Sequence, residues 1–239
     1  MALTCSPGVP PSPSRSPVDL AAVPLFSDLD PEQRDQLLEQ HRIVTFQADQ
    51  LVVLEQDESQ GLFLLRAGLA KVRSYSPEGE ENVLALLGPG DICGEMAVIN
   101  DGRRSADVVT LTASELVILR VGPFRALLYS EPRLALALAR LQSRRLQNLN
   151  RRFGLRSTDA TTRLLAALME LALHADPAAG LAAEIPPLPQ RELATLAGLA
   201  RETASRSLAK LRQRGTVREL EGGGLVIADL EPLQKRGLV

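Results

Sequence analysis

The segment from Gln190 to Arg214, QRELATLAGLARETASRSLAKLRQR, most constrains what this chain can fold into. Its apolar residues recur at helical spacing on both sides of Gly198, where the chain must reverse and where glycine tolerates a positive φ. The residues expected to face inward are Leu193, Leu196, Ala197, Ala204, Leu208 and Leu211. The pattern predicts two short helices joined by a tight turn.

The second of these helices is basic on its outer face. Glu202 is the one acidic residue there, and the basic residues are Arg201, Arg206, Lys210, Arg212 and Arg214. A helix pair with a glycine turn and a basic second helix is typical of a helix-turn-helix that reads DNA. The alternative is an ordinary helical hairpin with a solvated basic face.

Composition limits the other classes of function. The 239 residues carry a net charge of −2, so the basic charge is local. Aromatic residues make up 3%, which argues against platforms that stack single-stranded bases. Cys5 and Cys93 form no CxxC pair, so neither a metal site nor a disulfide framework is predicted. Without a signal peptide or a membrane-spanning apolar run, we expect a cytoplasmic protein that does not enter a membrane.

The N-terminal half changes from a polar leader to strands. Residues 1–19 are rich in Pro and Ser, and we expect a disordered leader. Asp30-Pro31 predicts the start of a helix that runs to about Gln40. From His41 to about Leu119, short β-prone runs alternate with Gly-rich turns, which predicts a small β-barrel or sandwich.

A long helix is predicted after Pro132, with no internal Gly or Pro before Gly154. Residues at alternating spacings of four and three form a seam typical of two paired helices. The seam comprises Ala135, Ala139, Gln142, Leu146, Leu149 and Phe153. A helix of about 30 Å is too long for one barrel to cover, so we expect a homodimer through paired helices. The alternative is that the seam packs on its own barrel.

The C-terminal third contains further helices and a hairpin. Ser157, Thr158 and Asp159 offer a new helix cap, which makes this segment the best domain boundary. The segment from Thr161 to His174 predicts an amphipathic helix. After the helix pair, residues 216–227 predict a β-hairpin that turns on three glycines. Such a hairpin is a wing, and we expect it to lie along a phosphate backbone.

Residues 88–106, GPGDICGEMAVINDGRRSA, are the candidate ligand site. Arg104 offers a guanidinium for a phosphate, and Ser105 and the backbone beside Gly94 add donors. Glu95 can accept a hydrogen bond from a sugar hydroxyl. This set suits a nucleotide. The alternative is a surface hairpin with a Glu95–Arg104 salt bridge.

Four motifs follow one another in a recognisable order: GLFLLRAGLAKV, LLGPGDICGEMAVINDGRRSA, RRLQ and QRELATLAGLARETASRSLAKL. From about Val23 onward the chain resembles the catabolite activator (Crp/Fnr) family of bacterial transcription regulators. The resemblance implies an α+β architecture of a cyclic-nucleotide-binding β-roll (20–130), a dimerisation helix (131–157) and a winged helix-turn-helix (158–239). It also implies RNA polymerase as a partner.

The resemblance implies roles for the candidate ligand residues. Arg104 and Ser105 fall where the family binds the cyclic phosphate, and Gly94-Glu95 falls where it binds the ribose 2′-hydroxyl. The family reads the base from the long helix with a Thr followed by Ser or Asn. Counting forward from Arg144-Arg145 places Leu149 at the Thr position and Asn150 beside it, where Asn150 would reach the base from the partner subunit. Counting back from Asp159 places Asn148 at the Thr position instead. cAMP is favoured and cGMP remains open.

The resemblance also implies roles in the reading helix. The RETxxR pattern puts Arg201, Glu202 and Arg206 on bases, since Arg suits guanine and Glu suits cytosine. The implied half-site resembles TGTGA in an inverted repeat. The expected phosphate contacts are Gln190, Lys210 and Arg218. Ala200 replaces the Ser or Thr that most relatives use as the helix cap, so we expect a weakened first turn.

We therefore expect a homodimeric DNA-binding regulator controlled by a cyclic nucleotide. The first alternative is the same regulator without any effector, and the second is a cyclic-nucleotide-binding interaction module that does not read DNA. The iron–sulfur and haem sensors of the family need N-terminal cysteines or a barrel histidine, and His41 and His174 are expected to be structural or surface residues. The sequence holds no recognisable nucleophile–His–acid set, phosphate loop or metal cluster, so we do not expect an enzyme.

Overall fold

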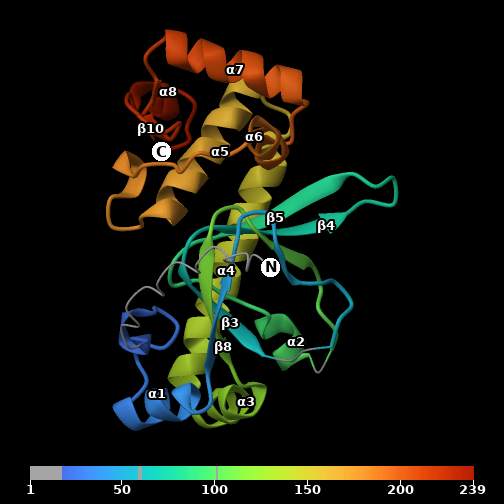
Figure 1. Cartoon of the computed structure of the whole chain (residues 1–239), viewed down its shortest axis with the longest axis vertical. Coiled ribbons are helices and arrows are strands. Elements are labelled where there is room, and N and C mark those ends of the chain that lie inside the picture. The colour runs from blue at the N-terminus through green and yellow to red at the C-terminus, as the bar shows by residue number, and fades with distance from the viewer. Residues whose placement is uncertain (1–17, 59–60, 101) are drawn as a thin grey trace, which may run out of the picture.

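The computed structural model describes residues 18–58, 61–100 and 102–239. The expected leader of residues 1–19 lies outside this part except for Val18 and Asp19. Asp19 starts a short 3₁₀ helix, η1 (Leu20–Ala22), because its carboxylate accepts a hydrogen bond from the Ala21 N–H at 2.9 Å. The described residues form a β-roll, a long helix and a mainly helical unit at the C-terminal end, an α+β architecture as expected (Figure 1).

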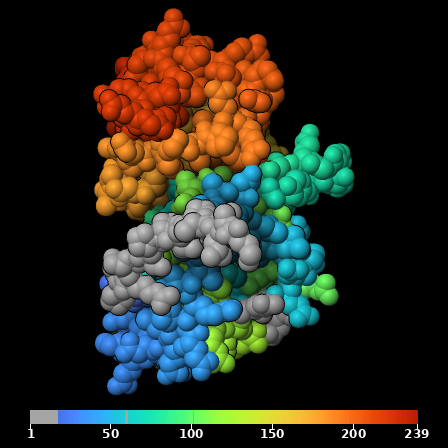
Figure 2. Space-filling model, in the orientation of Figure 1, coloured from blue at the N-terminus to red at the C-terminus, as the bar shows by residue number. Residues whose placement is uncertain are grey.

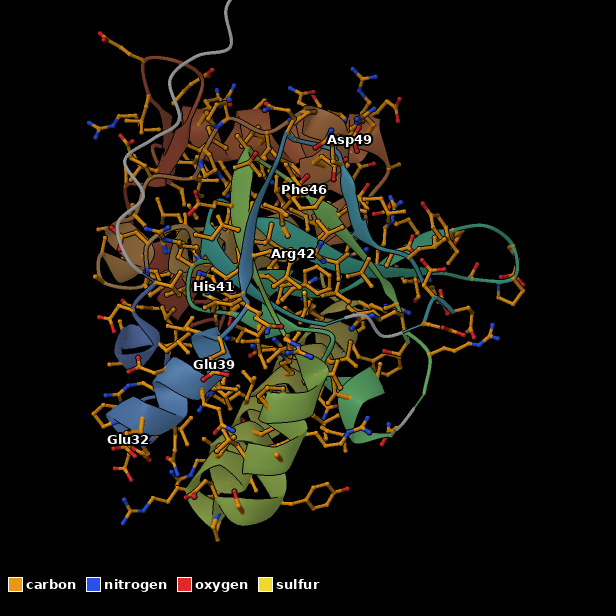
Figure 3. The ribbon with its side chains drawn as sticks, turned by 60° about the horizontal axis from the view of Figure 1, so that its bottom comes forward. Glu32, Glu39, His41, Arg42, Phe46 and Asp49 are labelled. Atoms are coloured by element: carbon orange, nitrogen blue, oxygen red, sulfur yellow. The ribbon has the colours of Figure 1, made fainter. Side chains whose placement is uncertain are left out.

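Helix α1 (Pro31–Leu38) begins where the sequence predicts. Its start is held by the Gln33 side chain, whose Oε1 accepts a hydrogen bond from the Asp30 N–H at 3.0 Å. The helix ends at Leu38 instead of Gln40, because Gln40 takes a left-handed conformation with φ 57°. His41 lies between α1 and the first strand, with its Nδ1 2.6 Å from the Leu38 carbonyl (Figure 3).

Two four-stranded antiparallel sheets form the β-roll. The first has the order β1 (Arg42–Phe46), β8 (Ser114–Leu119), β3 (Leu62–Ala67) and β6 (Ile92–Cys93). The second has the order β2 (Leu51–Val53), β7 (Asp107–Thr110), β4 (Ala70–Tyr75) and β5 (Glu81–Leu87). Short strands with glycine turns thus produce the closed β architecture that the sequence predicts.

Strand β3 shows why the roll needs helices on its outside. Successive side chains of a strand point to opposite faces. Phe63 and Leu65 pack between the two sheets. Leu62 and Leu64 pack on the other face, in a cluster with helix α3 (Val121–Ser130) and the start of the long helix. Because both faces are covered, four consecutive residues of β3 are buried.

Helix α4 (Pro132–Leu155) is the long helix that the sequence predicts, and it runs along the roll (Figure 1). Leu134 and Leu138 are buried against the roll. The seam side is open: Leu146 is 59% exposed and Phe153 is 71% exposed. Leu146 and Leu149 also line a cavity against the roll, so the choice between helix pairing and packing on the roll stays a prediction. None of the described helices is long and apolar enough to cross a membrane.

Helix α2 (Glu95–Ile99) is an element that the sequence analysis did not anticipate. It spans little more than one turn, too short for a recognisable periodicity. Gly94 makes it possible by taking a left-handed conformation, with φ 90°, at the helix start. The strand β6 therefore passes directly into a helix that carries Glu95.

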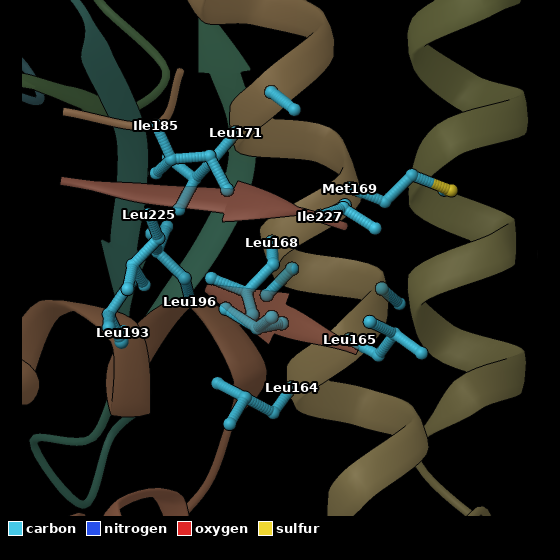
Figure 4. Close-up of a cluster of buried hydrophobic side chains, with 14 of the residues drawn as sticks. Leu164, Leu165, Leu168, Met169, Leu171, Ile185, Leu193, Leu196, Leu225 and Ile227 are labelled. Atoms are coloured by element: carbon cyan, nitrogen blue, oxygen red, sulfur yellow. The ribbon is translucent and has the colours of Figure 1, made fainter. Parts of the chain in front are cut away.

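The C-terminal unit (residues 160–238) contains the predicted helix pair and hairpin. It comprises α5 (Ala160–Ala175), η2 (Gly180–Ala182), α6 (Gln190–Ala197), α7 (Arg201–Gln213), β9 (Val217–Glu219), β10 (Leu225–Ile227) and α8 (Glu231–Gln234). Asp159 caps α5 by accepting hydrogen bonds from the Thr161 and Thr162 N–H groups. Buried side chains from α5, α6 and the hairpin form its core (Figure 4).

The core of the C-terminal unit extends into the roll. Leu69, Leu86 and Leu111 of the roll belong to the same cluster of buried residues as Leu168 of α5 and Leu196 of α6. The unit stacks directly on the roll in the space-filling view (Figure 2). Apolar contact therefore joins the two parts, in addition to the chain that connects α4 to α5.

A buried lysine reinforces this junction. Lys71 of β4 is 2% exposed, and lysine is almost never fully buried unless it is paired. Its Nζ lies 2.7 Å from Glu81 of β5 and 2.6 Å from Glu192 of α6. The Lys71–Glu192 pair thus links the roll to the first helix of the helix-turn-helix.

We expect Lys71→Ala to destabilise the protein by about 3 kcal/mol, because it removes from two largely buried carboxylates the cation that lies nearest to them. Urea unfolding measures the change. Lys235→Ala is the matched control: Lys235 also forms a salt bridge, 2.7 Å from Glu231, but both side chains are exposed. That variant should lose less than about 0.5 kcal/mol. Equal losses for the two variants would contradict this assignment.

Candidate functional site

A cavity of about 400 Å³ opens between the second sheet, α2 and α4, and we call it the ligand cavity. Its polar wall contains all four residues of the predicted phosphate and sugar site: Gly94, Glu95, Arg104 and Ser105. Its apolar wall includes Val53, Val72, Leu84, Ala85 and Val108 from the strands. Gln142, Arg145, Leu146 and Leu149 of α4 complete it. The fold therefore brings the two ends of segment 88–106 to one cavity, as the sequence predicts.

Arg104 is a buried cation at this cavity, with 4% of its surface exposed. Its Nη1 donates to the Gly94 carbonyl at 3.0 Å and its Nη2 donates to the Gly61 carbonyl at 2.7 Å. The guanidinium also lies 5.4 Å from the centre of the Phe63 ring. Burial lowers the pKa of Arg104 from its ordinary value, although arginine remains charged. A buried cation held by carbonyl groups favours an anionic ligand.

The backbone of Gly94 lies close to the Arg104 guanidinium. A Cβ atom added at Gly94 would lie 2.0 Å from the Arg104 Nη1, and the left-handed backbone already disfavours any other residue. The glycine therefore has two functions. It turns the chain into α2, and it leaves room for the guanidinium.

Glu95 is 2% exposed and does not form the alternative salt bridge with Arg104. Instead, its Oε1 accepts hydrogen bonds from Gln142 Nε2 at 2.6 Å and from Arg145 Nη1 at 2.7 Å. Its Oε2 is buried and has no hydrogen-bond partner in the structure. An unsatisfied buried acceptor is costly, so this oxygen is well suited to a hydroxyl donor of a ligand.

Ser105 and Cys93 also line the ligand cavity. Ser105 is exposed, and its hydroxyl contacts the Met96 sulfur at 3.7 Å, a weak interaction that leaves it available to a ligand. Burial raises the pKa of the Cys93 thiol to about 12. Cys93 is therefore protonated at neutral pH and contributes a small apolar surface.

The two asparagines of α4 do not line the ligand cavity. Asn148 lines a smaller hollow beside Arg144 and His174, and Asn150 is exposed on α4. Leu149 is the residue of this segment that faces the cavity. This placement agrees with counting forward from Arg144-Arg145, which puts Leu149 at the position of the family's Thr. The roles of Asn148 and Asn150 remain predictions.

Sequence reasoning missed Gln142 and Arg145 as site residues. Heptad spacing placed Gln142 in the seam, and Arg145 was named only as part of the RRLQ motif. Both side chains lie on the cavity side of α4 and reach Glu95, about 50 positions away along the chain. A signal was present, because positions 142, 145, 146 and 149 recur at helical spacing, but the sequence does not show what they face.

The helix-turn-helix has the predicted geometry. Gly198 takes φ 60° between α6 and α7, and Arg163 of α5 donates hydrogen bonds to the carbonyls of Ala197 and Gly198. The inward residues named from the sequence are buried: Leu193, Leu196, Ala197, Ala204, Leu208 and Leu211. The core side of α7 is thus fixed, which leaves its basic face outward.

The outer face of α7 forms the candidate nucleic-acid interface. Arg201, Glu202 and Arg206 are exposed and surround a shallow hollow with Gln190 and Ser205. Lys210 and Arg218 are exposed on the helix and the wing. Arg212 Nη2 lies 2.9 Å from a Glu219 oxygen, which ties α7 to the wing strand β9. Four of the predicted DNA-contacting residues therefore share one accessible surface, and the other two, Lys210 and Arg218, are accessible as well.

Comparison with known proteins identifies both parts. Residues 43–131 match the cyclic nucleotide-binding domain, and residues 162–236 match the Crp-like helix-turn-helix domain. The CRP-like cAMP-activated global transcriptional regulator of Mycobacterium tuberculosis is 31% identical over 219 residues, which cover 91% of this chain and 97% of that protein. The Cyclic AMP receptor protein of Thermus thermophilus is 35% identical over 199 residues, which cover 82% and 88%.

A solved structure shares the fold. FixK2 from Bradyrhizobium japonicum has a TM-score of 0.70 at 16% identity, covering 82% of this chain and 96% of that chain. The fold and the two matched domains define a DNA-binding transcription regulator with a cyclic nucleotide-binding domain. The chain belongs to the Crp/Fnr family, as its motifs predict. Its relatives are transcription regulators, which are generally not enzymes.

The start of α7 lacks a side-chain cap, as the sequence predicts. Ala200 is extended, with φ −63° and ψ 146°, which is the backbone conformation of a helix cap, but it offers no acceptor to the first turn. We expect Ala200→Ser to stabilise the protein by about 1 kcal/mol, measured by thermal unfolding. As a control, Ala209→Ser, at an exposed position inside α7, should be slightly destabilising. An unchanged melting temperature for Ala200→Ser would refute the idea.

Proposed function

We propose that the protein is a homodimeric regulator that binds cAMP in the ligand cavity and reads a TGTGA-like inverted repeat. The observation that carries this proposal is the pairing of a buried cation, Arg104, with a buried free acceptor, Glu95 Oε2. A cyclic nucleotide presents a matching anionic phosphate and a ribose hydroxyl. The names of the relatives, cAMP-activated regulator and cyclic AMP receptor protein, support cAMP in particular.

One end of the cavity is polar and the other is apolar, which supports one orientation of a bound nucleotide. Arg104, Ser105 and the Gly94 region would hold the phosphate, and Glu95 would accept from the 2′-hydroxyl. The base would then extend toward Leu146 and Leu149, which provide an apolar surface. Asn150 would reach the base from the partner subunit, or Asn148 would do so if the other count holds. cGMP is the competing effector.

The open seam of α4 supports the homodimer. Leu146, Leu149 and Phe153 are exposed in the single chain, at 59%, 39% and 71%. Exposed apolar side chains spaced every three or four residues along a helix favour pairing with a second helix. A two-fold dimer would present two copies of α7, which suits an inverted repeat.

The basic face of α7 supports base reading. Arg201 and Arg206 would bind guanine and Glu202 would bind cytosine, while Gln190, Lys210 and Arg218 would contact phosphates. RNA polymerase would be a protein partner of the DNA-bound dimer, as the family resemblance implies. The rival proposal is a regulator that binds the same DNA without any effector.

We expect calorimetric titration to show cAMP binding to the wild-type protein, and cAMP to strengthen binding to a TGTGA inverted repeat in a mobility-shift assay. Gly94→Ala should weaken cAMP binding at least about tenfold, because its Cβ displaces the Arg104 guanidinium. Gly79→Ala is the matched control: Gly79 also has a positive φ, 82°, but no atom lies within 4 Å of an added Cβ.

Four further results would decide between the proposed function and its alternatives. Binding of the repeat that no cyclic nucleotide changes would support the effector-free rival. A stronger response to cGMP would reassign the effector. Arg201→Ala should weaken binding to the repeat at least about tenfold, while Arg133→Ala, an exposed arginine at the start of α4, should not. Failure of the wild-type protein to distinguish the repeat from scrambled DNA would contradict sequence reading.

We expect Phe153→Glu to shift the protein from dimer to monomer in light scattering after size-exclusion chromatography, because charges would face each other across the paired helices. Leu230→Glu is the control, since Leu230 is 41% exposed but lies next to α8, outside the seam. A dimer that persists unchanged in Phe153→Glu and across dilution would place the interface elsewhere.

A further inference from the structure

Gln142 occupies an unusual position between two surfaces of α4. On one side it lines the ligand cavity. On the other it lines an apolar groove of about 310 Å³ between α2, α3 and α4, beside Ala135 and Ala139 of the seam. Its heptad position predicts an apolar residue, and glutamine is therefore out of place for packing alone.

The amide of Gln142 has a specific partner in the cavity. Its Nε2 donates to Glu95 Oε1 at 2.6 Å, and Arg145 Nη1 donates to the same oxygen at 2.7 Å. Two donors on one oxygen fix the rotation of the carboxylate more tightly than a single donor would. The second oxygen, Oε2, is left buried and without a partner.

We infer that Gln142 is a positioning residue: it orients Glu95 so that Oε2 faces a ligand hydroxyl, and it thereby sets the preference for a ribose over a 2′-deoxyribose nucleotide. The inference rests on the proposed function of the cavity. Arg145 supplies charge to Glu95 and also donates to the Ile92 carbonyl, so it holds the carboxylate to the roll. Gln142 supplies the second contact that prevents the two carboxylate oxygens from exchanging places.

This position also makes hydroxyl recognition depend on the long helix. Gln142 can reach Glu95 only while α4 keeps its rotation against the roll. A rotation of α4 that moved Gln142 away from Glu95 would remove one of the two donors to Oε1 and turn a polar amide toward the apolar residues of the seam. Recognition of the hydroxyl by Glu95 and packing of the seam therefore both depend on the Gln142 side chain.

The test compares cAMP with 2′-deoxy-cAMP by calorimetric titration of the full chain. The wild-type protein should prefer cAMP roughly tenfold or more, as expected for a hydrogen bond to a charged group. Gln142→Met keeps the length of the side chain and removes the amide. It should reduce that preference below about threefold, mainly by weakening cAMP binding, since the deoxy analogue lacks the hydroxyl in question. Gln147→Met, an exposed glutamine on the same helix, should keep the wild-type preference.

Each other outcome is informative. An equal loss of affinity for both nucleotides in Gln142→Met overturns the inference, because a purely structural role would affect both. A preference that survives in Gln142→Met also overturns it, even if sedimentation shows altered dimerisation. Wild-type protein that binds both nucleotides equally refutes the inference and leaves cyclic nucleotide binding intact. Wild-type protein that binds neither refutes both proposals.

Discussion

The structure depends on the two-sided packing of helix α4. Leu134 and Leu138 are buried on the roll, Leu146 and Leu149 of the seam border the ligand cavity, and Phe153 of the seam is exposed. The same helix closes the ligand cavity with Arg145 and precedes the C-terminal unit. Because α4 lines the cavity, carries the seam and is joined to the C-terminal unit, a small rotation of this helix would change the cavity, the seam and the placement of that unit together. Coupling requires only that the ligand prefer one of these arrangements.

Strand β5 is the second element that several parts share. Leu84 and Ala85 line the ligand cavity, whereas Leu86 packs in the core of the C-terminal unit and Glu81 belongs to the ion cluster of Lys71. Neighbouring residues of one strand thus face the ligand cavity and the C-terminal unit. This arrangement gives a contiguous physical route between the two sites, in which each contact is a packed side chain or an ion pair.

The sequence predicted the features that rest on local patterns. Short β-prone runs separated by glycine-rich turns indicated the roll, the unbroken stretch after Pro132 indicated α4, and Gly198 marked the turn of the helix pair. The features it did not predict depend on contacts between distant positions. Gln142 was assigned to the seam because heptad spacing cannot show that its amide reaches Glu95. The Lys71–Glu192 pair joins residues 121 positions apart, and only the fold brings them together. Helix α2 was missed because it is too short to show a period.

The core shared by the roll and the C-terminal unit has a thermal consequence. Leu69, Leu86 and Leu111 are covered by the C-terminal unit, so a movement that separates the two parts exposes apolar surface to water. Exposure of apolar surface raises the heat capacity. The enthalpy difference between the arrangement in which the two parts pack together and one in which they are separated would then vary with temperature. The populations of the two arrangements would vary with it. The balance between the two arrangements would therefore shift with temperature as well as with any ligand that prefers one of them.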